Sequence, residues 1–386
     1  MPKKLRCAFQ NSSLFMVAVL IGIAICEVMA RLVAPISLVT FPVLYNGEIT
    51  YEPNQRQRYV SPEWDYEISI NADGFRDNVL LQDLPPKSAV FVGDSFIEGY
   101  GLPLEDTVVK KLERILASKG RGGVIYNAGH NNTSPNNYSS VWENYFSKRS
   151  EIESVLVGFF IGNDLLEGIK QGHLDRGKVR DYESVRWTNS VRYFLSEHSV
   201  LYNLINYTLK ANRSAHAACR TMGFCGAAHP DDIYLRENVA PLLRPTIERM
   251  REFAEAVRRS KQRMLVVLIP TKDQISDDGW NAIRAYYAYR KPERFYANDA
   301  IVAAFRANCI PVLDLTGPFL ERQRAREPSL YFQSDGHWSA AGTEFAAHLI
   351  ADVLASPEQA CASYQSSHGA IRGDGLSSDW QHKSGN

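Results

Sequence analysis

The chain has 386 residues, and its 43 lysines and arginines balance its 43 aspartates and glutamates. With 45% hydrophobic and 11% aromatic residues, this balance excludes collagens, low-complexity polymers and strongly charged tail proteins. A net charge of zero creates no field that gathers nucleic acid, and we find no local basic patch, so we expect no nucleic-acid partner.

The N-terminus carries an apolar segment behind a basic flank. Three basic residues within positions 1–13 precede residues 14–33, whose two charges, Glu27 and Arg31, lie near the far end. This pattern predicts a cytoplasmic N-terminus at 1–13 and a transmembrane signal anchor at 14–33. A cleaved signal peptide is the alternative, and both interpretations place the rest of the chain outside the cytoplasm. The terminal position disfavours a buried core helix.

The order of the remaining segments indicates an α/β fold. Residues 34–87 are predicted to be an irregular lead-in with short strands, in which the turn Asn71–Gly74 precedes Phe75 and Arg76. From residue 88, continuously apolar runs alternate with helical patterns, which is typical of a parallel sheet covered on both faces. The runs that predict strands are residues 89–92, 124–126, 155–160, 264–269 and 310–313. The helical patterns are at residues 104–116, 136–148, 242–260, 299–307 and from Ser339 to Leu354.

Two further segments interrupt or follow this alternation. Residues 168–240 have patchy helical character and are predicted to be a mostly helical cap inserted into a domain at 88–356, and the polar tail at 357–386 is predicted to be disordered. The cap contains Cys219 and Cys225, which become a candidate disulfide in an oxidising compartment, with two free thiols as the alternative. Six cysteines are too few for a disulfide scaffold.

Chemically capable residues follow three of the predicted strands. The carboxyl ends of parallel strands carry the active sites of such sheets, so these positions are the first candidates. Ser95 follows residues 89–92 on a strand-to-helix turn, where a serine hydroxyl is exposed and can act as a nucleophile. Gly129 lets its N–H approach a ligand, and Asn163 can donate to a developing oxyanion. Each segment has an ordinary interpretation as a turn or helix cap.

A fourth segment precedes the last helix and supplies an acid and a base. Asp335 and His337 are two residues apart, and His337 as general base with Asp335 as its orienting partner would complete a nucleophile–base–acid triad with Ser95. We expect His130, next to Gly129, to lie on the surface, with substrate contact as the alternative.

These four segments together, in this order, resemble the blocks of the SGNH hydrolases, or GDSL esterases and lipases. Gly93-Asp94-Ser95 resembles the first block, Gly129 the second, Asn163 the third, and Asp335-Gly336-His337 the last. Two departures are the DxH spacing in place of the family's usual DxxH and Phe96 in place of the leucine of GDSL. His337-Trp338-Ser339 also resembles the closing block of alginate O-acetyltransferase SGNH domains, although a packing role explains Trp338 equally well.

The resemblance implies a flavodoxin-like, doubly wound sheet of five parallel strands and a covalent mechanism without metal or cofactor. Ser95, His337 and Asp335 would be the triad, and the N–H of Ser95, the N–H of Gly129 and the amide of Asn163 would form the oxyanion hole. The leading hypothesis is an extracytoplasmic serine esterase acting on an acylated carbohydrate or another small ester. The alternatives are an O-acetyltransferase for an exported polysaccharide and a non-catalytic glycan-binding or assembly protein.

Overall fold

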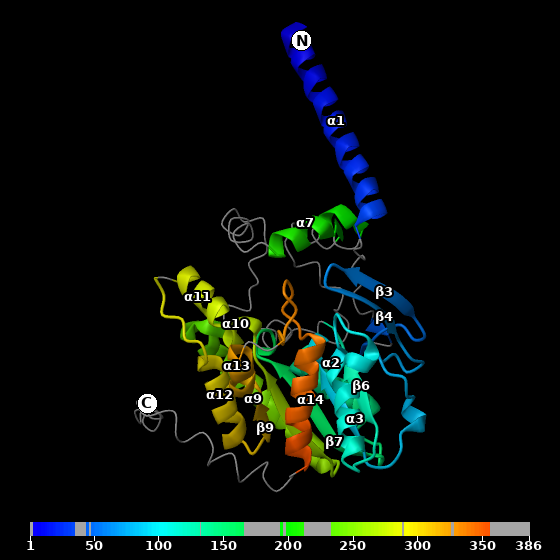
Figure 1. Cartoon of the computed structure of the whole chain (residues 1–386), viewed down its shortest axis with the longest axis vertical. Helices are drawn as coiled ribbons and strands as arrows, with labels where there is room; N and C mark the ends of the chain where they lie inside the picture. Colours follow the sequence, from blue (N-terminus) through cyan, green and yellow to red (C-terminus); the bar gives the residue numbers. More distant parts are fainter. Residues whose placement is uncertain are drawn as a thin grey trace, which may run out of the picture.

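Five parallel strands form a sheet at the centre of the protein, which we describe from a computed structural model (Figure 1). Its order is β6-β5-β7-β8-β9, so the chain starts inside the sheet, steps to one edge and then winds toward the other. This confirms the predicted flavodoxin-like, doubly wound architecture. The strands are β5 (Ser88–Gly93), β6 (Ile125–Gly129), β7 (Ile152–Phe160), β8 (Arg263–Ile269) and β9 (Val312–Asp314).

The structure describes most but not all of the chain. The described residues are 3–34, 44–45, 48–131, 133–165, 194–195, 198–211, 233–287, 289–325 and 328–355. Cys219, Cys225, the tail at 357–386 and most of the insertion at 168–240 lie outside them. The predicted domain boundaries therefore remain predictions.

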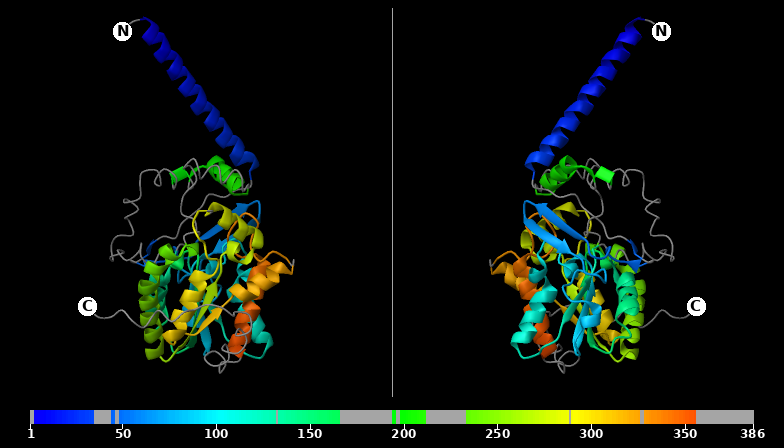
Figure 2. Two further views of the ribbon diagram at one scale, coloured as in Figure 1. Left: turned by 90° about the vertical axis from the view of Figure 1, so that its left-hand side faces the viewer. Right: turned by 90° about the vertical axis from the view of Figure 1, so that its right-hand side faces the viewer.

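Helices cover both faces of the sheet, as the side views show (Figure 2). Alternate strand residues point to opposite faces, so that Val90 and Val92 belong to one buried cluster and Phe91 to the other. The first cluster is closed by α4 (Pro135–Tyr145), α9 (Arg236–Arg259) and α12 (Tyr296–Ala307). The second is closed by α3 (Val108–Ser118), α13 (Thr316–Arg324) and α14 (Ala340–Ala355).

The remaining elements are short or lie outside the sheet. Sequence patterns did not predict the helices Lys272–Ile275, Asp277–Tyr286 and Thr316–Arg324, whereas the helix Val200–Ala211 lies in the insertion that was expected to be mostly helical and the lead-in was expected to contain short strands. The remaining helices are α2 (Ser95–Glu98), α7 (Val200–Ala211), α10 (Lys272–Ile275) and α11 (Asp277–Tyr286), with the 3₁₀ turns η1 (Leu81–Asp83) and η2 (Leu104–Asp106). The remaining strands form two antiparallel pairs, β1 (Leu44–Tyr45) with β2 (Glu48–Ile49) and β3 (Arg56–Ser61) with β4 (Trp64–Ser69).

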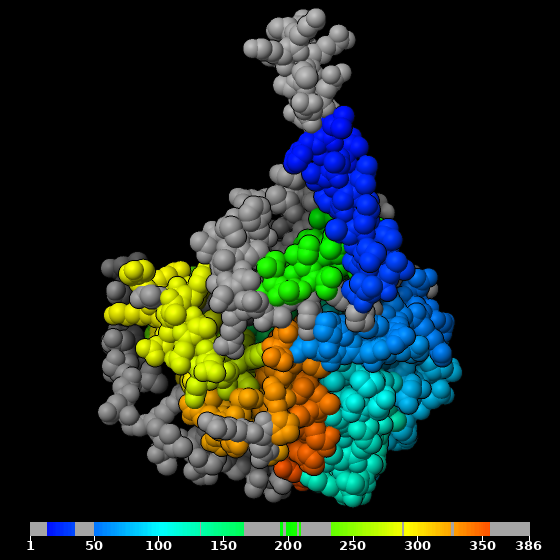
Figure 3. All heavy atoms as spheres, turned by 45° about the horizontal axis from the view of Figure 1, so that its top comes forward, coloured from blue at the N-terminus to red at the C-terminus, as the bar shows by residue number. Residues whose placement is uncertain are grey.

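The N-terminal helix α1 (Lys3–Val33) projects from the rest of the structure and meets it at α7 (Figures 1 and 3). Residues Leu14–Val33 are long and apolar enough to cross a membrane, and only 6% of this stretch is buried. Near its end, the Glu27 carboxylate accepts hydrogen bonds from Ser199 Oγ at 2.7 Å and from the Val200 N–H at 3.0 Å. The charge near the end of the apolar segment thus caps the first turn of α7.

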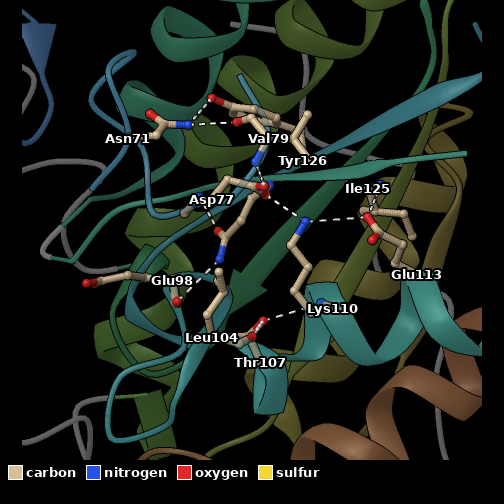
Figure 4. A network of polar contacts seen from close by, with 12 residues as sticks. Asn71, Asp77, Val79, Glu98, Leu104, Thr107, Lys110, Glu113, Ile125 and Tyr126 are labelled. Atoms are coloured by element: carbon tan, nitrogen blue, oxygen red, sulfur yellow. Dashed lines mark hydrogen bonds and ion pairs between the residues drawn. The ribbon is translucent and has the colours of Figure 1, made fainter. Parts of the chain in front are cut away.

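The lead-in is docked on the sheet by a buried polar network (Figure 4). Asp77 Oδ2 lies 3.0 Å from Lys110 Nζ of α3 and accepts the Asn127 N–H of β6 at 2.8 Å. Asn71 Nδ2 donates to the Tyr126 hydroxyl at 3.0 Å. Burial raises the pKa of Asp77, and the charge of Lys110 opposes this rise. The lead-in is therefore packed as part of the α/β unit.

Removing Lys110 from this network should be strongly destabilising. Its side chain is 7% exposed and that of Asp77 is 0% exposed, so Lys110→Met leaves a buried carboxylate without its cation. We expect a loss of about 3–5 kcal/mol in the free energy of unfolding, measured by urea denaturation. The matched control, Lys119→Met, breaks a pair with Asp352 that is 38% and 70% exposed and should cost at most about 1 kcal/mol. Equal losses in the two variants would contradict this.

Candidate active site

Ser95 lies at the carboxyl edge of the sheet, where β5 turns directly into α2. Gly93 is the last residue of β5, Asp94 is the N-cap residue, and Ser95 is the first residue of α2. Asp94 Oδ1 accepts the N–H of Phe96 at 2.9 Å, which fixes the turn. Gly99, with φ of 90°, ends α2 after a single turn. The Ser95 residue is 7% exposed, on the side of the sheet where the loop before α14 arrives.

The structure brings Ser95, His337 and Asp335 together. Ser95 Oγ lies 2.7 Å from His337 Nε2, and His337 Nδ1 lies 2.5 Å from Asp335 Oδ1. The same Asp335 oxygen accepts the backbone N–H of His337 at 2.9 Å. A spacing of one intervening residue therefore suffices for the carboxylate to reach the ring. With Nδ1–H donating to Asp335, Nε2 is left to accept the serine proton.

The electrostatic surroundings of His337 favour its protonated form. Burial lowers the pKa of His337, but the charge of Asp335 and its hydrogen bond outweigh this effect, so the pKa is raised above its usual value. Asp94 and Glu98 add to the rise through their charges. A base with a raised pKa takes up a proton more readily, as general-base catalysis on a serine requires.

Asn163 lies in the turn after β7 (Ile152–Phe160) and faces Asp94. Its Nδ2 donates to Asp94 Oδ2 at 3.2 Å. Asp94 is fully buried, and this burial raises its pKa to about 6 although Phe96 and Asn163 donate to it. Asp94 thus links the turn of the nucleophile to the predicted oxyanion donor. This contact agrees with a turn-holding role for Asp94.

Gly129 ends β6 next to α2, and the structure explains why it is a glycine. A Cβ atom at this position would lie 2.2 Å from the Glu98 nitrogen, so no other residue lets α2 pack this closely on β6. Its N–H donates to Asn127 Oδ1 at 3.0 Å. An oxyanion role for Gly129 requires this N–H to share or exchange that partner, and it stays a prediction.

Aromatic rings surround the imidazole of His337. The Tyr100 ring lies 4.7 Å and the Phe96 ring 5.0 Å from it, centroid to centroid. Phe96 also contacts Trp338, which is 1% exposed and belongs to a core cluster. Trp338 therefore has the packing role, and the phenylalanine in the GDSL-like block is a change of packing beside the base.

His130 is not on the surface, contrary to expectation. It is 1% exposed, its ring stacks on Tyr51 at 5.4 Å, and it meets Phe75 edge-on at 5.2 Å. Burial lowers its pKa to about 4, so it is neutral at physiological pH. The ring fills a core position between the lead-in and β6, because the lead-in folds over the segment that the sequence pattern left exposed.

Sequence patterns missed several residues that support the site. Glu98 is buried beneath it with a pKa of about 6, raised by burial against the charge of Arg76. Arg76 donates to the carbonyl oxygens of Glu98 and Gly99 at 3.0 and 2.7 Å, which holds the chain leading to Tyr100. The turn Asn71–Gly74 before Arg76 was the only local signal for it. Among the described residues, no group of three His, Cys, Asp or Glu side chains is arranged to hold a metal ion.

Comparison with known proteins places this geometry in a class. Residues 230–372 match the family model described as "SGNH hydrolase-like domain, acetyltransferase AlgX". This region includes Asp335 and His337, whereas Ser95 lies before it. No curated protein matches the chain. Residues 230–372 are thus similar to an SGNH hydrolase-like domain, which agrees with an enzyme that acts on esters by hydrolysis or acyl transfer.

Two solved structures of ester-cleaving proteins are distantly similar to this chain. A member of the lipolytic protein G-D-S-L family from Veillonella parvula DSM 2008 is 14% identical, with a TM-score of 0.38 over 70% of this chain and 99% of that chain. A catalytic mutant of an acetylxylan esterase from Geobacillus stearothermophilus is 11% identical, with a TM-score of 0.39 over 69% of this chain and 93% of that chain.

The contacts of His337 predict the pH dependence of an ester-cleaving reaction. Because only neutral His337 can accept the serine proton, kcat/KM for an aryl acetate should fall as the pH drops through the pKa of His337, which lies above 6.5. Asp335→Asn should move this fall in kcat/KM to lower pH, because it removes the charge that raises the pKa of His337 most. The same substitution should reduce kcat/KM by at least about 100-fold. Asp278→Asn, on an exposed carboxylate of α11, is the control and should change neither. An unmoved limb in Asp335→Asn would contradict the assignment.

Proposed function

We propose that the protein is an extracytoplasmic serine esterase of the SGNH type that removes the acyl group from an acylated carbohydrate or another small ester. The observation that carries this proposal is the hydrogen-bonded series from Ser95 Oγ through both nitrogens of His337 to Asp335, with distances of 2.7 and 2.5 Å. Such a series activates a serine hydroxyl that is otherwise a weak nucleophile.

The reaction then runs in two steps on the same residues. Ser95 Oγ attacks the ester carbonyl while its proton passes to His337 Nε2, and the resulting imidazolium is stabilised by Asp335. His337 returns the proton to the leaving alcohol, which leaves the acyl group as an ester on Ser95. A water molecule, deprotonated by His337, releases the acid and restores the serine.

Two of the three donors of the proposed oxyanion hole have other hydrogen-bond partners in the structure. The N–H of Ser95, the N–H of Gly129 and Nδ2 of Asn163 are the donors that we assign to the tetrahedral oxyanion. Gly129 donates to Asn127 and Asn163 donates to Asp94 in the free enzyme. Charge developing on the substrate oxygen would compete for these donors, since hydrogen bonds to a charged acceptor are the stronger ones.

Acyl transfer to a sugar hydroxyl of an exported polysaccharide is the second candidate. The match of residues 230–372 to a domain described as an acetyltransferase favours it. The triad is used unchanged, because an acceptor hydroxyl replaces water in the second step and gives its proton to His337.

The test of both candidates starts from Ser95→Ala, which removes the nucleophile and leaves the rest of the site. We expect hydrolysis of an aryl acetate to fall by at least about 1000-fold and the mass of an acyl group to appear on Ser95 of the wild type only. Addition of an oligosaccharide acceptor should then separate the two candidates by the amount of acetylated sugar formed relative to free acetate. Equal rates in the wild type and Ser95→Ala would refute both and favour a non-catalytic glycan-binding protein.

We further propose that α1 anchors the protein in a membrane, with the α/β unit outside the cytoplasm. The hydropathy of Leu14–Val33 supports this, and a retained helix would keep the hydrogen bonds between Glu27 and the start of α7.

The anchor and the cleaved signal peptide predict different mature proteins. We expect the full chain to remain in the membrane pellet after alkaline carbonate extraction and the chain without residues 1–33 to be soluble. Mass spectrometry of the purified protein should then find the residues of α1 intact. A soluble product that begins after residue 30 would instead identify a signal peptide.

A further inference from the structure

Asp335 and His337 lie on a short loop that precedes α14. A bridge between Tyr331 and Trp338 closes its base, and the Phe332 N–H donates to the His337 carbonyl oxygen at 3.0 Å. A Cβ at Gly336 would meet no atom within 4 Å, so the tip of the loop is open on that side. The loop therefore needs partners from elsewhere in the chain if Asp335 is to hold a constant distance from His337.

Glu63 is such a partner, and it comes from the lead-in. It lies in the two-residue turn between β3 and β4, and its Oε1 accepts the Gln333 N–H at 2.6 Å. Its Oε2 accepts the Ser334 N–H at 2.9 Å. One carboxylate thus binds the two backbone N–H groups that directly precede Asp335. Figure 3 shows the lead-in, in blue, meeting the segment before α14, in orange.

Lys272 binds the same stretch through its carbonyl groups. It is the first residue of α10, and its Nζ donates to the Phe332 oxygen at 2.7 Å and to the Gln333 oxygen at 2.5 Å. The anion and the cation therefore hold N–H and C=O groups of residues 332–334 from two separate elements. Hydrogen bonds to charged groups are roughly twice as strong as neutral ones.

The hairpin that carries Glu63 is itself fixed against the site. Trp64 packs on Phe332 at 4.9 Å and on Tyr100 at 5.5 Å between ring centroids, and Tyr100 lies against His337. On the same face of β4, Tyr66 and Ile68 belong to a small core against which Trp64 also packs. Glu63 is therefore presented by a packed element rather than by a free loop.

We infer that Glu63 and Lys272 are positioning residues, which hold the backbone of residues 332–334 so that Asp335 keeps His337 oriented toward Ser95. This makes the lead-in hairpin part of the active site, and it rests on the proposed function of Ser95, His337 and Asp335. A displacement of about 1 Å at reacting groups can cost about 100-fold in rate, so a clamp one residue from Asp335 has a direct effect on turnover.

The test compares Glu63→Ala and Glu63→Gln with Glu67→Ala, an exposed glutamate on β4 of the same hairpin. We measure kcat and KM for an aryl acetate, the melting temperature, and the pKa of His337 by NMR of histidine-labelled full-length protein. Glu63→Ala should lower kcat by about 10- to 100-fold with KM changed less than about threefold. The kcat of Glu63→Gln should lie between those of the wild type and Glu63→Ala, because an amide offers one acceptor oxygen for two N–H groups.

The titration of His337 separates positioning from a merely structural role. Asp335, Asp94 and Glu98 are the groups whose charges raise the pKa of His337, and Asp335, which has the largest raising effect, directly follows the clamped residues. Glu63→Ala and Lys272→Met should therefore lower this pKa, whereas Glu67→Ala should leave it unchanged. If Glu63→Ala does not fold, Glu63→Gln carries the comparison.

Two results would overturn the inference: an unchanged kcat and His337 titration in folded Glu63 variants, or an equal loss in Glu67→Ala. The NMR titration needs no turnover. An inactive wild type would therefore refute the proposed function, while the clamp would still be judged by the pKa of His337 in the variants.

Discussion

The pairing of β5 with strands on both sides is the constraint on which the site depends. Gly93 pairs with Gly129 of β6, and Val92 pairs with Val157 of β7, so the carboxyl ends of three parallel strands meet within one short arc of the sheet edge. A serine that follows the middle strand must then lie between the residues that follow its neighbours. The glycine at 129 makes this arc tight enough for α2 to lie directly on β6. The other residues at the site, such as His337, Asp335 and Glu63, reach this edge of the sheet from segments that are more distant along the chain.

That distinction explains how much the sequence could predict. Residues 89–92 and 264–269 are apolar throughout because the sheet is covered on both faces, so the strands, their parallel arrangement and the residues at their ends could be predicted from local pattern. The flavodoxin-like, doubly wound arrangement was expected only from the family resemblance. Asp335 and His337 could also be predicted, because a carboxylate and an imidazole two residues apart in the sequence are a recognisable pair. Glu63 was not, since it binds Gln333 across 270 residues, and no local pattern marks a turn glutamate as the partner of a distant backbone. For the same reason the contact of Asn163 with Asp94, 69 residues earlier in the chain, had to come from the structure.

The zero net charge of the chain conceals an uneven distribution around the site. Asp94 and Glu98 are buried beneath the triad and Arg76 is buried beside them, while Lys272 and Glu63 lie closer to the surface above. The two buried carboxyls both have a pKa of about 6, raised by burial. As the pH rises through this range they become charged and add to the influence of Asp335 on His337. The acid limb of the reaction is therefore a property of four coupled groups rather than of His337 alone.

The triad does not by itself choose between water and a sugar hydroxyl, because His337 accepts a proton from either. In the proposed reaction, the choice would belong to the groups that determine which molecule reaches the acyl carbon on Ser95. Tyr100 lies against His337, and Trp64 packs on both Tyr100 and Phe332. Two of the three rings are held by the same elements that hold the acid–base loop. The lead-in hairpin therefore connects the loop that carries Asp335 and His337 to the aromatic rings beside His337, through Glu63 in its turn and Trp64 at the start of β4.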